Sequence, residues 1–239
     1  MTGRALGTPA GAVAPEFLVT TDLLDAISPS ADRGGVVLGC GLHDEPLSVS
    51  VLRPFPTRLA LVGGRYLASQ VALRTMATGA WVVVATSRPD SWQQLLHAAG
   101  EGPEEHPAPL VQVRRPASLE LPRASADAPL LVVHDDGAVP QELFPPRSPW
   151  QTTLSVLPSL HPQAESTAIN ADLVLLQRLP AGQAQLAAEL WQLSAPMTHQ
   201  LTTLTDDGVV ALGPNLWLPL RLVTTPAERE ILGPVRRGD

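Results

Sequence analysis

Apolar runs alternate with polar stretches rich in glycine or proline along most of the chain. WVVVATS (residues 81–87) is a near-continuous apolar and β-branched run, which is typical of a strand buried on both faces of a sheet. PLLVVHDDG (129–137) has the same character and ends in two acidic residues. Further strands are predicted at residues 36–52 (two strands joined by the polar turn LHDEP), 58–62, 110–113, 151–160 and 171–179, and in a closing hairpin of 208–213 and 216–223.

Helical spacing of apolar residues marks several of the segments between these strands. The longest lies at residues 66–80 (YLASQVALRTMATGA). Shorter helices are predicted at residues 89–100, 181–193, 196–204 and 225–232. Asp90 or Ser91 is the expected N-cap of the first of these, and Thr225 with Glu228 forms an expected capping box in the last. Strands that alternate with helices predict an α/β fold, with a mainly parallel sheet flanked by helices.

The composition shifts near the start of the chain. Residues 1–15 are rich in Gly, Ala, Pro and Thr, and EFLVTTDLLDAI (16–27) has the pattern of a short helix or arm. We predict a flexible N-terminal arm over residues 1–33 and a single α/β domain over residues 34–239. No apolar run reaches the roughly 18–20 residues that span a bilayer, and no signal-peptide pattern opens the chain. A cytoplasmic location is therefore expected, with membrane association only through a partner.

Lysine is absent from the sequence. All 16 basic residues are arginines, against 23 acidic residues and a net charge of −7. Mechanisms that need a lysine are therefore excluded, and the acidic balance argues against general nucleic-acid binding, which usually needs a basic face. The single cysteine, Cys40, cannot form an internal disulfide or a cysteine zinc site by itself. No histidine spacing resembles a zinc motif. The adjacent acids Asp135 and Asp136 could form a metal site, but two carboxylates at the end of a strand more often cap a loop or the next helix. We therefore expect neither a metal nor another cofactor.

The stretch RLALVGGRYLASQVAL (58–73) has the order strand, glycine turn, helix, which is how many proteins build a phosphate cradle. A working P-loop reads G-x-x-x-x-G-K-[ST], where backbone N–H groups and the lysine hold the phosphates and the hydroxyl holds Mg²⁺. Here Gly63 and Gly64 are followed by Arg65, with no second glycine at the required distance and no lysine. Ser69 on the following helix also lacks the G-x-S-x-G setting of a hydrolase nucleophile.

The order of the segments resembles the FtsK/SpoIIIE-like ATPases, which include the EccC motor of actinobacterial type VII secretion systems. The segments that carry the resemblance are VVLGCGLHDEPLSVSVL (36–52) for the hairpin before the Walker A strand, RLALVGG (58–64) for that strand, LLVVHDD (130–136) for the Walker B strand, and INADLVLLQRL (169–179) and GVVALGPNLWLPLRLVTTPAEREIL (208–232) for the later segments. Asp135 and Asp136 match the Walker B acids. The resemblance covers residues 36–232 and implies a P-loop NTPase fold of the RecA/FtsK type, with a preceding β-hairpin and a C-terminal hairpin.

The departures from this family fall on the groups that its reaction uses. The Walker A lysine and hydroxyl are missing, the γ-phosphate-sensing glutamine position is Leu160, and the arginine of N-x-x-x-R is Val174. Hydrolysis depends on positioning and charge stabilisation. The resemblance therefore implies a pseudo-ATPase that is not an enzyme and that binds proteins, such as an FtsK/EccC-type motor or other secretion components. Its degenerate nucleotide pocket is predicted to comprise Gly63, Gly64, Arg65, Ser69, Asp135, Asp136 and Leu160.

Two other classes of function stay open. A Rossmann-like dinucleotide-binding domain or oxidoreductase subunit is one, because residues 63–68 partly match G-x-G-x-x-G/A. Arg65 stands at the middle glycine of that motif, however, and the strand at 81–87 ends without an acid to bind a ribose. An α/β domain with an unrelated duty is the other.

Overall fold

The computed structural model describes residues 35–100, 110–116, 119–137, 140 and 145–235. These residues belong to one compact unit. The arm predicted over residues 1–33, with its helix at 16–27, lies outside the described residues. No helix in the described ranges combines the length and the apolar character that crossing a bilayer requires.

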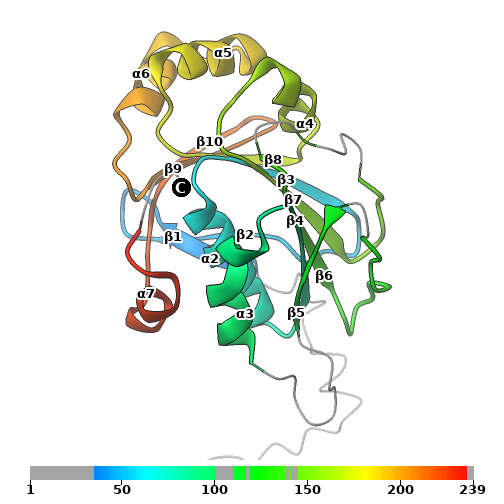
Figure 1. Ribbon diagram of the computed structural model, residues 1–239. Coiled ribbons are helices and arrows are strands. Elements are labelled where there is room, and N and C mark those ends of the chain that lie inside the picture. The colour runs from blue at the N-terminus through cyan, green and yellow to red at the C-terminus, as the bar shows by residue number, and fades with distance from the viewer. Residues whose placement is uncertain (1–34, 101–109, 117–118, 138–139, 141–144, 236–239) are drawn as a thin grey trace, which may run out of the picture. The chain divides into compact units, whose positions relative to one another are not determined.

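A sheet, ten-stranded within the described ranges, runs through the unit (Figure 1). In chain order its strands are β1 (Val36–Cys40), β2 (Pro46–Val49), β3 (Thr57–Val62), β4 (Trp81–Thr86), β5 (Val111–Arg114), β6 (Leu130–Asp135), β7 (Gln151–Leu157), β8 (Leu173–Leu176), β9 (Gly208–Gly213) and β10 (Leu216–Leu222). Their order across the sheet is β2-β1-β10-β9-β8-β3-β7-β6-β4-β5. The strands from β8 to β5 pair in parallel, and the remaining strands pair antiparallel. The predicted α/β fold with a mainly parallel sheet is confirmed.

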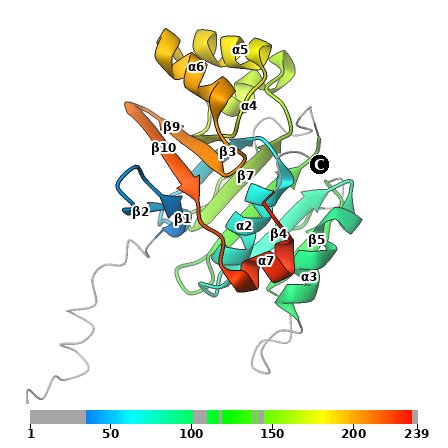
Figure 2. The same cartoon turned by 90° about the vertical axis from the view of Figure 1, so that its left-hand side faces the viewer.

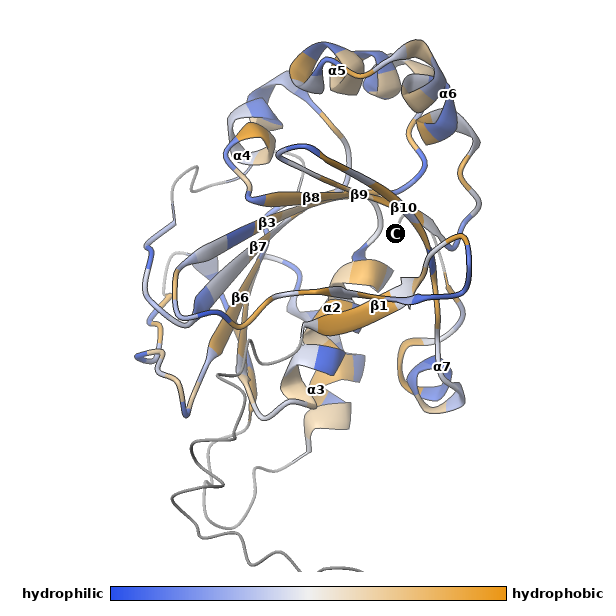
Figure 3. Ribbon diagram, turned by 180° about the vertical axis from the view of Figure 1, so that it is seen from behind, coloured by the Kyte–Doolittle hydropathy of each residue, from blue (hydrophilic) through white to orange (hydrophobic). Residues whose placement is uncertain are grey.

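Helices cover both faces of the sheet (Figures 1 and 2). They are α2 (Arg65–Met76), α3 (Gln93–Ala99) and α7 (Pro226–Leu232) on one face, and α4 (Glu165–Ile169), α5 (Ala181–Trp191) and α6 (Ala195–Thr203) on the other. Successive residues of β3 point to opposite faces. Leu59 and Leu61 therefore pack with α2 and α3, whereas Ala60 and Val62 pack with α4, α5 and α6. Burial on both faces explains the apolar runs, and Figure 3 shows the hydrophobic colour along β6, β8 and β9.

The two predicted hairpins, β1–β2 and β9–β10, join to extend the sheet on its antiparallel side. Gly39 of β1 pairs with Leu222 of β10, and a Cβ at Gly39 would lie 2.0 Å from the carbonyl oxygen of Arg221. Only glycine permits this close approach of the two backbones. The sequence predicts both hairpins but contains no local signal for their pairing.

Two local expectations differ from the structure. The helix expected at residues 89–100 begins as a 3₁₀ turn, η1 (Pro89–Trp92), and α3 starts only at Gln93. Neither Asp90 nor Ser91 caps it, because Trp92 occupies the N-cap position with its indole held in the core. The connection between β7 and β8, for which no helix is predicted, contains the short 3₁₀ turn η3 (Pro162–Ala164) and α4.

The capping box at the start of α7 is confirmed, and it is part of a larger connection. Thr225 Oγ1 accepts the N–H of Glu228 at 3.1 Å, and the Glu228 carboxylate accepts the N–H of Thr225 at 2.8 Å. The same carboxylate binds Arg74 of α2, which also donates to the carbonyl oxygens of Val37 and Val223. Arg74 therefore joins α2, α7 and the antiparallel strands.

Replacing Glu228 with glutamine is expected to destabilise the protein at neutral pH and to do so less at low pH. Burial alone raises the pKa of Glu228, but hydrogen bonds from Arg74 and Thr225 and the charge of Arg74 outweigh it, so the pKa lies below its ordinary value of 4.5. A carboxylate with a depressed folded-state pKa stabilises the protein above the unfolded-state pKa, and this contribution is lost as pH falls through the folded-state pKa.

Urea unfolding between pH 7 and pH 3 measures this dependence. The stability difference between the unmodified chain and Glu228→Gln should be about 1–3 kcal/mol at pH 7 and shrink below about pH 4.5. Glu230→Gln, at an exposed position of the same helix, is the control and should change stability little. A difference that stays constant over the whole range would contradict the prediction.

Candidate functional site

The turn between β3 and α2 lies where the carboxyl ends of β3, β7 and β8 meet. Gly63 has φ +156° and its N–H donates to the Leu157 carbonyl oxygen at 2.9 Å. Gly64 is the N-cap of α2, with φ −77° and ψ 152°, values open to any residue, and no side chain caps the helix. The Gly64 N–H, which could face a phosphate in a cradle, donates instead to Oε1 of Gln177 at 2.6 Å.

Gln177 directly follows β8 and is 1% exposed. Its backbone N–H donates to the Val62 carbonyl oxygen at 3.0 Å, which extends the pairing of β8 with β3. Its side chain lies against the turn: a Cβ at Gly63 would meet Oε1 at 2.3 Å and the Gln177 Cβ at 2.9 Å. The requirement for glycine at residue 63 therefore comes from the side chain of Gln177 as well as from the positive φ of Gly63.

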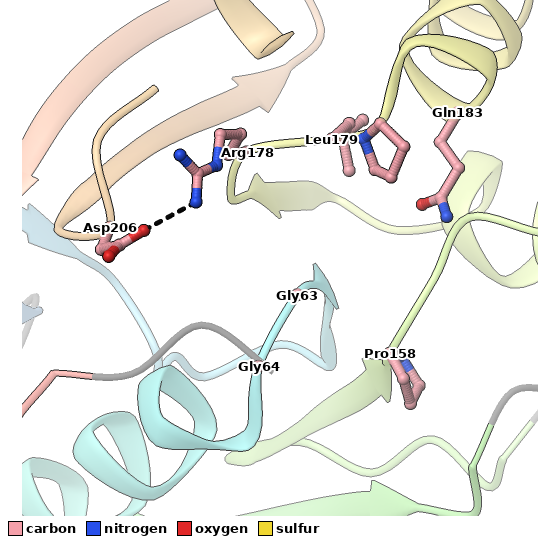
Figure 4. A pocket seen from close by; sticks show the side chains of 8 residues that line it. Gly63, Gly64, Pro158, Arg178, Leu179, Gln183 and Asp206 are labelled. Atoms are coloured by element: carbon pink, nitrogen blue, oxygen red, sulfur yellow. Dashed lines mark hydrogen bonds and ion pairs between the residues drawn. The ribbon is translucent and has the colours of Figure 1, made fainter. Parts of the chain in front are cut away.

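A cavity of about 390 Å³ opens beside the glycine turn. Its lining consists of Gly63, Gly64, Pro158, Arg178, Leu179, Pro180, Gln183 and Asp206. Figure 4 shows Arg178 directed toward Asp206, with which it forms an ion pair at 2.9 Å, and Gln183 reaching down from α5. The guanidinium of Arg178 is thus paired with Asp206, an acid on the lining of the same cavity.

Arg65 and Ser69 do not line the cavity beside the glycine turn. They line a second cavity of about 350 Å³ between α2, the 3₁₀ turn η1 and the end of α7, together with Tyr66, Asp90, Ser91, Gln94, Leu232, Gly233 and Pro234. Arg65 and Ser69 therefore line a different cavity from Gly63 and Gly64, although Arg65 directly follows Gly64 in the chain.

The carboxylate of Asp135, at the end of β6, is fully buried and accepts hydrogen bonds at both oxygens. Arg88 donates to Oδ1 at 2.6 Å, and the indole N–H of Trp92 donates to Oδ2 at 2.9 Å. The hydroxyl of Thr86 lies 3.0 Å from the Asp135 carbonyl oxygen and 3.3 Å from Oδ2. Asp135 thus fastens the 3₁₀ turn η1, which precedes α3, to the sheet.

The remaining predicted site residues lie apart from this network. Asp136 lies beside His134, with 3.9 Å between Oδ2 and Nδ1, and both line a small cavity of about 10 Å³. Leu160 is buried in the core between the sheet, α4 and α5, where its N–H donates to Oε1 of Gln183 at 2.9 Å. Across the described ranges, no group of three or more His, Cys, Asp or Glu residues could hold a metal ion.

Sequence reasoning missed the polar residues that contact the glycine turn or line the cavity beside it. Gln177 and Arg178 follow β8 directly, within the segment LLQRLP, and Gln183 and Asp206 lie farther along the chain. A polar pair at the carboxyl end of a parallel strand was a usable signal, because such ends meet at one edge of the sheet. Their partners, Gly64 and Asp206, could not be inferred, since these contacts join residues far apart in the sequence.

No protein-family model and no curated protein matches the sequence. Among solved structures, the fold is similar to VirB4 of Thermoanaerobacter pseudethanolicus, with a TM-score of 0.53 and 8% identity over 81% of this chain and 98% of that chain. B204, the DNA-packaging ATPase from Sulfolobus Turreted Icosahedral Virus, has a TM-score of 0.49 and 7% identity over 70% of this chain and 98% of that chain.

The similarity to VirB4 concerns the fold: this chain has the α/β fold of that protein. The predicted fold class is therefore confirmed. The finer likeness to FtsK/EccC-type motors remains a prediction, because identity of 8% concerns the fold alone.

Proposed function

We propose that this chain is a catalytically silent P-loop-fold domain that acts by binding other proteins. The observation that carries the proposal is that Asp135, which matches a Walker B acid, is already hydrogen-bonded within the fold. Its two carboxylate oxygens accept hydrogen bonds from Arg88 and Trp92, so it holds the fold together instead of ordering a hydrated Mg²⁺. Phosphoryl transfer in P-loop NTPases uses that acid through its metal ion.

The cationic groups near the site support the same proposal. The chain contains no lysine, Arg65 lines a different cavity, and Arg178 is paired with Asp206. Arg178, the cation on the lining of the cavity beside the glycine turn, could therefore neutralise a triphosphate only by breaking its ion pair with Asp206. A domain that has kept its sheet and helices but lost the groups that react with ATP still has surfaces through which it can bind other proteins.

The resemblance to EccC suggests what kind of partner to test. FtsK-like domains stack as rings or strings, so a silent copy is suited to docking on an FtsK/EccC-type motor or another type VII secretion component. Such a motor would bring the chain to the membrane through the partner. This part of the proposal rests on the order of segments and on single motifs such as LLVVHDD.

Purified protein is expected to show no ATP turnover with Mg²⁺ and no thermal shift with ATP, ADP, NAD or NADP. A ligand at about 100 times its Kd adds about 2.7 kcal/mol of stability, which a melting curve detects easily. Turnover that disappears on changing Arg65 would refute the silent domain. A shift with NAD or NADP alone would instead support the dinucleotide-binding alternative.

The partner is tested directly with purified components. Size-exclusion chromatography with light scattering should show a complex with an EccC-type motor encoded in the same genome. The same experiment with duplex DNA should show none, given the net charge of −7. Absence of a complex at micromolar concentrations of both proteins would refute the secretion role. The domain would then have to bind a different partner.

A further inference from the structure

The side chain of Gln177 occupies the position on the glycine turn that an anion would take. The N-terminus of a helix attracts anions because its first N–H groups lack intrahelical partners. Here α2, a helix of 12 residues, has no side-chain cap, and the Gly64 N–H donates to Oε1 of Gln177. Oε1 of Gln177, which follows β8, thus accepts the hydrogen bond that the Gly64 N–H could otherwise donate to a phosphate oxygen.

The packing around Gln177 is built for this contact. The missing side chain at Gly63 leaves the space that Oε1 fills, since a Cβ there would lie 2.3 Å from this oxygen. The other end of the amide, Nε2, is buried and makes no hydrogen bond with the described residues. Burying a donor without a partner costs free energy. Gln177 is therefore buried with one end of its amide unpaired, while the other end, Oε1, accepts the Gly64 N–H.

We propose that Gln177 is the residue that excludes phosphate and related anions from the glycine turn. The inference deepens the proposed function, on which it rests: loss of the lysine removes the attraction for a triphosphate, and Gln177 closes the remaining backbone site. Removing its side chain would open the Gly64 N–H to the cavity of about 390 Å³. Arg178, on the lining of that cavity, stays paired with Asp206, so the gain in affinity for an anion would come from the freed backbone donor.

The test measures pyrophosphate and sulfate binding to Gln177→Ala by isothermal titration calorimetry at low ionic strength. The variant should bind pyrophosphate at least about tenfold more tightly than the unmodified chain. Gln183→Ala is the matched control: it removes a glutamine that lines the same cavity, but one that accepts the Leu160 N–H and not a turn N–H. This control should bind no more tightly than the unmodified chain.

Two further variants separate exclusion from general loosening. Gln177→Glu keeps an acceptor at the turn and adds a full negative charge, so it should gain no affinity for pyrophosphate. Gln177→Asn withdraws the oxygen by one methylene and should gain less than Gln177→Ala. It also serves if the alanine variant does not fold, which circular dichroism and cooperative melting would reveal.

Hydrogen exchange of the unmodified chain gives a readout that needs no ligand. The Gly64 amide should be protected, because it is buried and bound to Oε1. Fast exchange of this amide, or equal pyrophosphate affinities of folded Gln177→Ala and the unmodified chain, would overturn the inference. ATP turnover by the unmodified chain would instead refute the proposed function, so the two failures are distinguishable.

Discussion

Asp135→Ala is expected to lower the free energy of unfolding by about 2–4 kcal/mol, because it leaves buried donors without an acceptor. The indole N–H of Trp92 would lose its acceptor inside the core, and Arg88 would lose the group that holds its guanidinium. The side chain of Arg88 is 41% exposed and can turn to water, which limits the total loss. Urea unfolding followed by circular dichroism measures the change.

Asp206→Ala is the matched control for this variant. Asp206 also pairs with an arginine, but its side chain is 64% exposed, and exposed ion pairs contribute about 0–1 kcal/mol. If Asp135 had no structural role, its replacement by alanine would change the free energy of unfolding as little as the replacement of Asp206. Equal, small effects of the two variants would therefore contradict the structural role of Asp135 and weaken the case for a silent domain.

Trp92→Ala is expected to destabilise the protein by about 3–5 kcal/mol, the cost of truncating a fully buried aromatic side chain. Trp92 is 1% exposed and belongs to the core between the sheet and α2 and α3. Its loss would leave a cavity under the start of α3 and remove the donor to Asp135. Thermal and urea unfolding should both report the change.

Two substitutions divide this effect into its parts. Trp92→Phe keeps most of the ring volume and loses the indole N–H, so it should cost about 1–3 kcal/mol through the lost hydrogen bond. Trp217→Ala removes a half-buried tryptophan from β10 and should cost less than Trp92→Ala. A Trp92→Phe variant as unstable as Trp92→Ala would show that the hydrogen bond, and not the packing, decides the stability.

Much of the fold could be predicted from the sequence because its signals are local. The run at β4 and the run at β6 are apolar at almost every position, which reflects burial on both faces of the sheet. Thr225 and Glu228 lie three residues apart, so their capping box could be predicted from spacing alone. The N-cap of α3 could not, because the core around Trp92 decides where that helix starts.

The candidate site was predictable only in part, since its contacts join distant segments. Gly63 and Gly64 were found from their place between a strand and a helix, but the glutamine that lies against them is 113 residues away from Gly64. Asp135 was found at the end of β6, but its donor Trp92 comes from 43 residues earlier. Arg65, adjacent to the glycine pair in sequence, faces a different cavity.

The sequence by itself determined most of the segments that form strands and helices, though not α4, and it determined that no lysine can act anywhere in this chain. Periodicity and composition are properties of neighbouring residues, so they need no knowledge of the fold. Only the tertiary structure decided what the glycine turn holds and what Asp135 binds. Hydrogen bonds between the ends of parallel strands depend on the order of those strands in the sheet, and that order is set by packing across the whole domain.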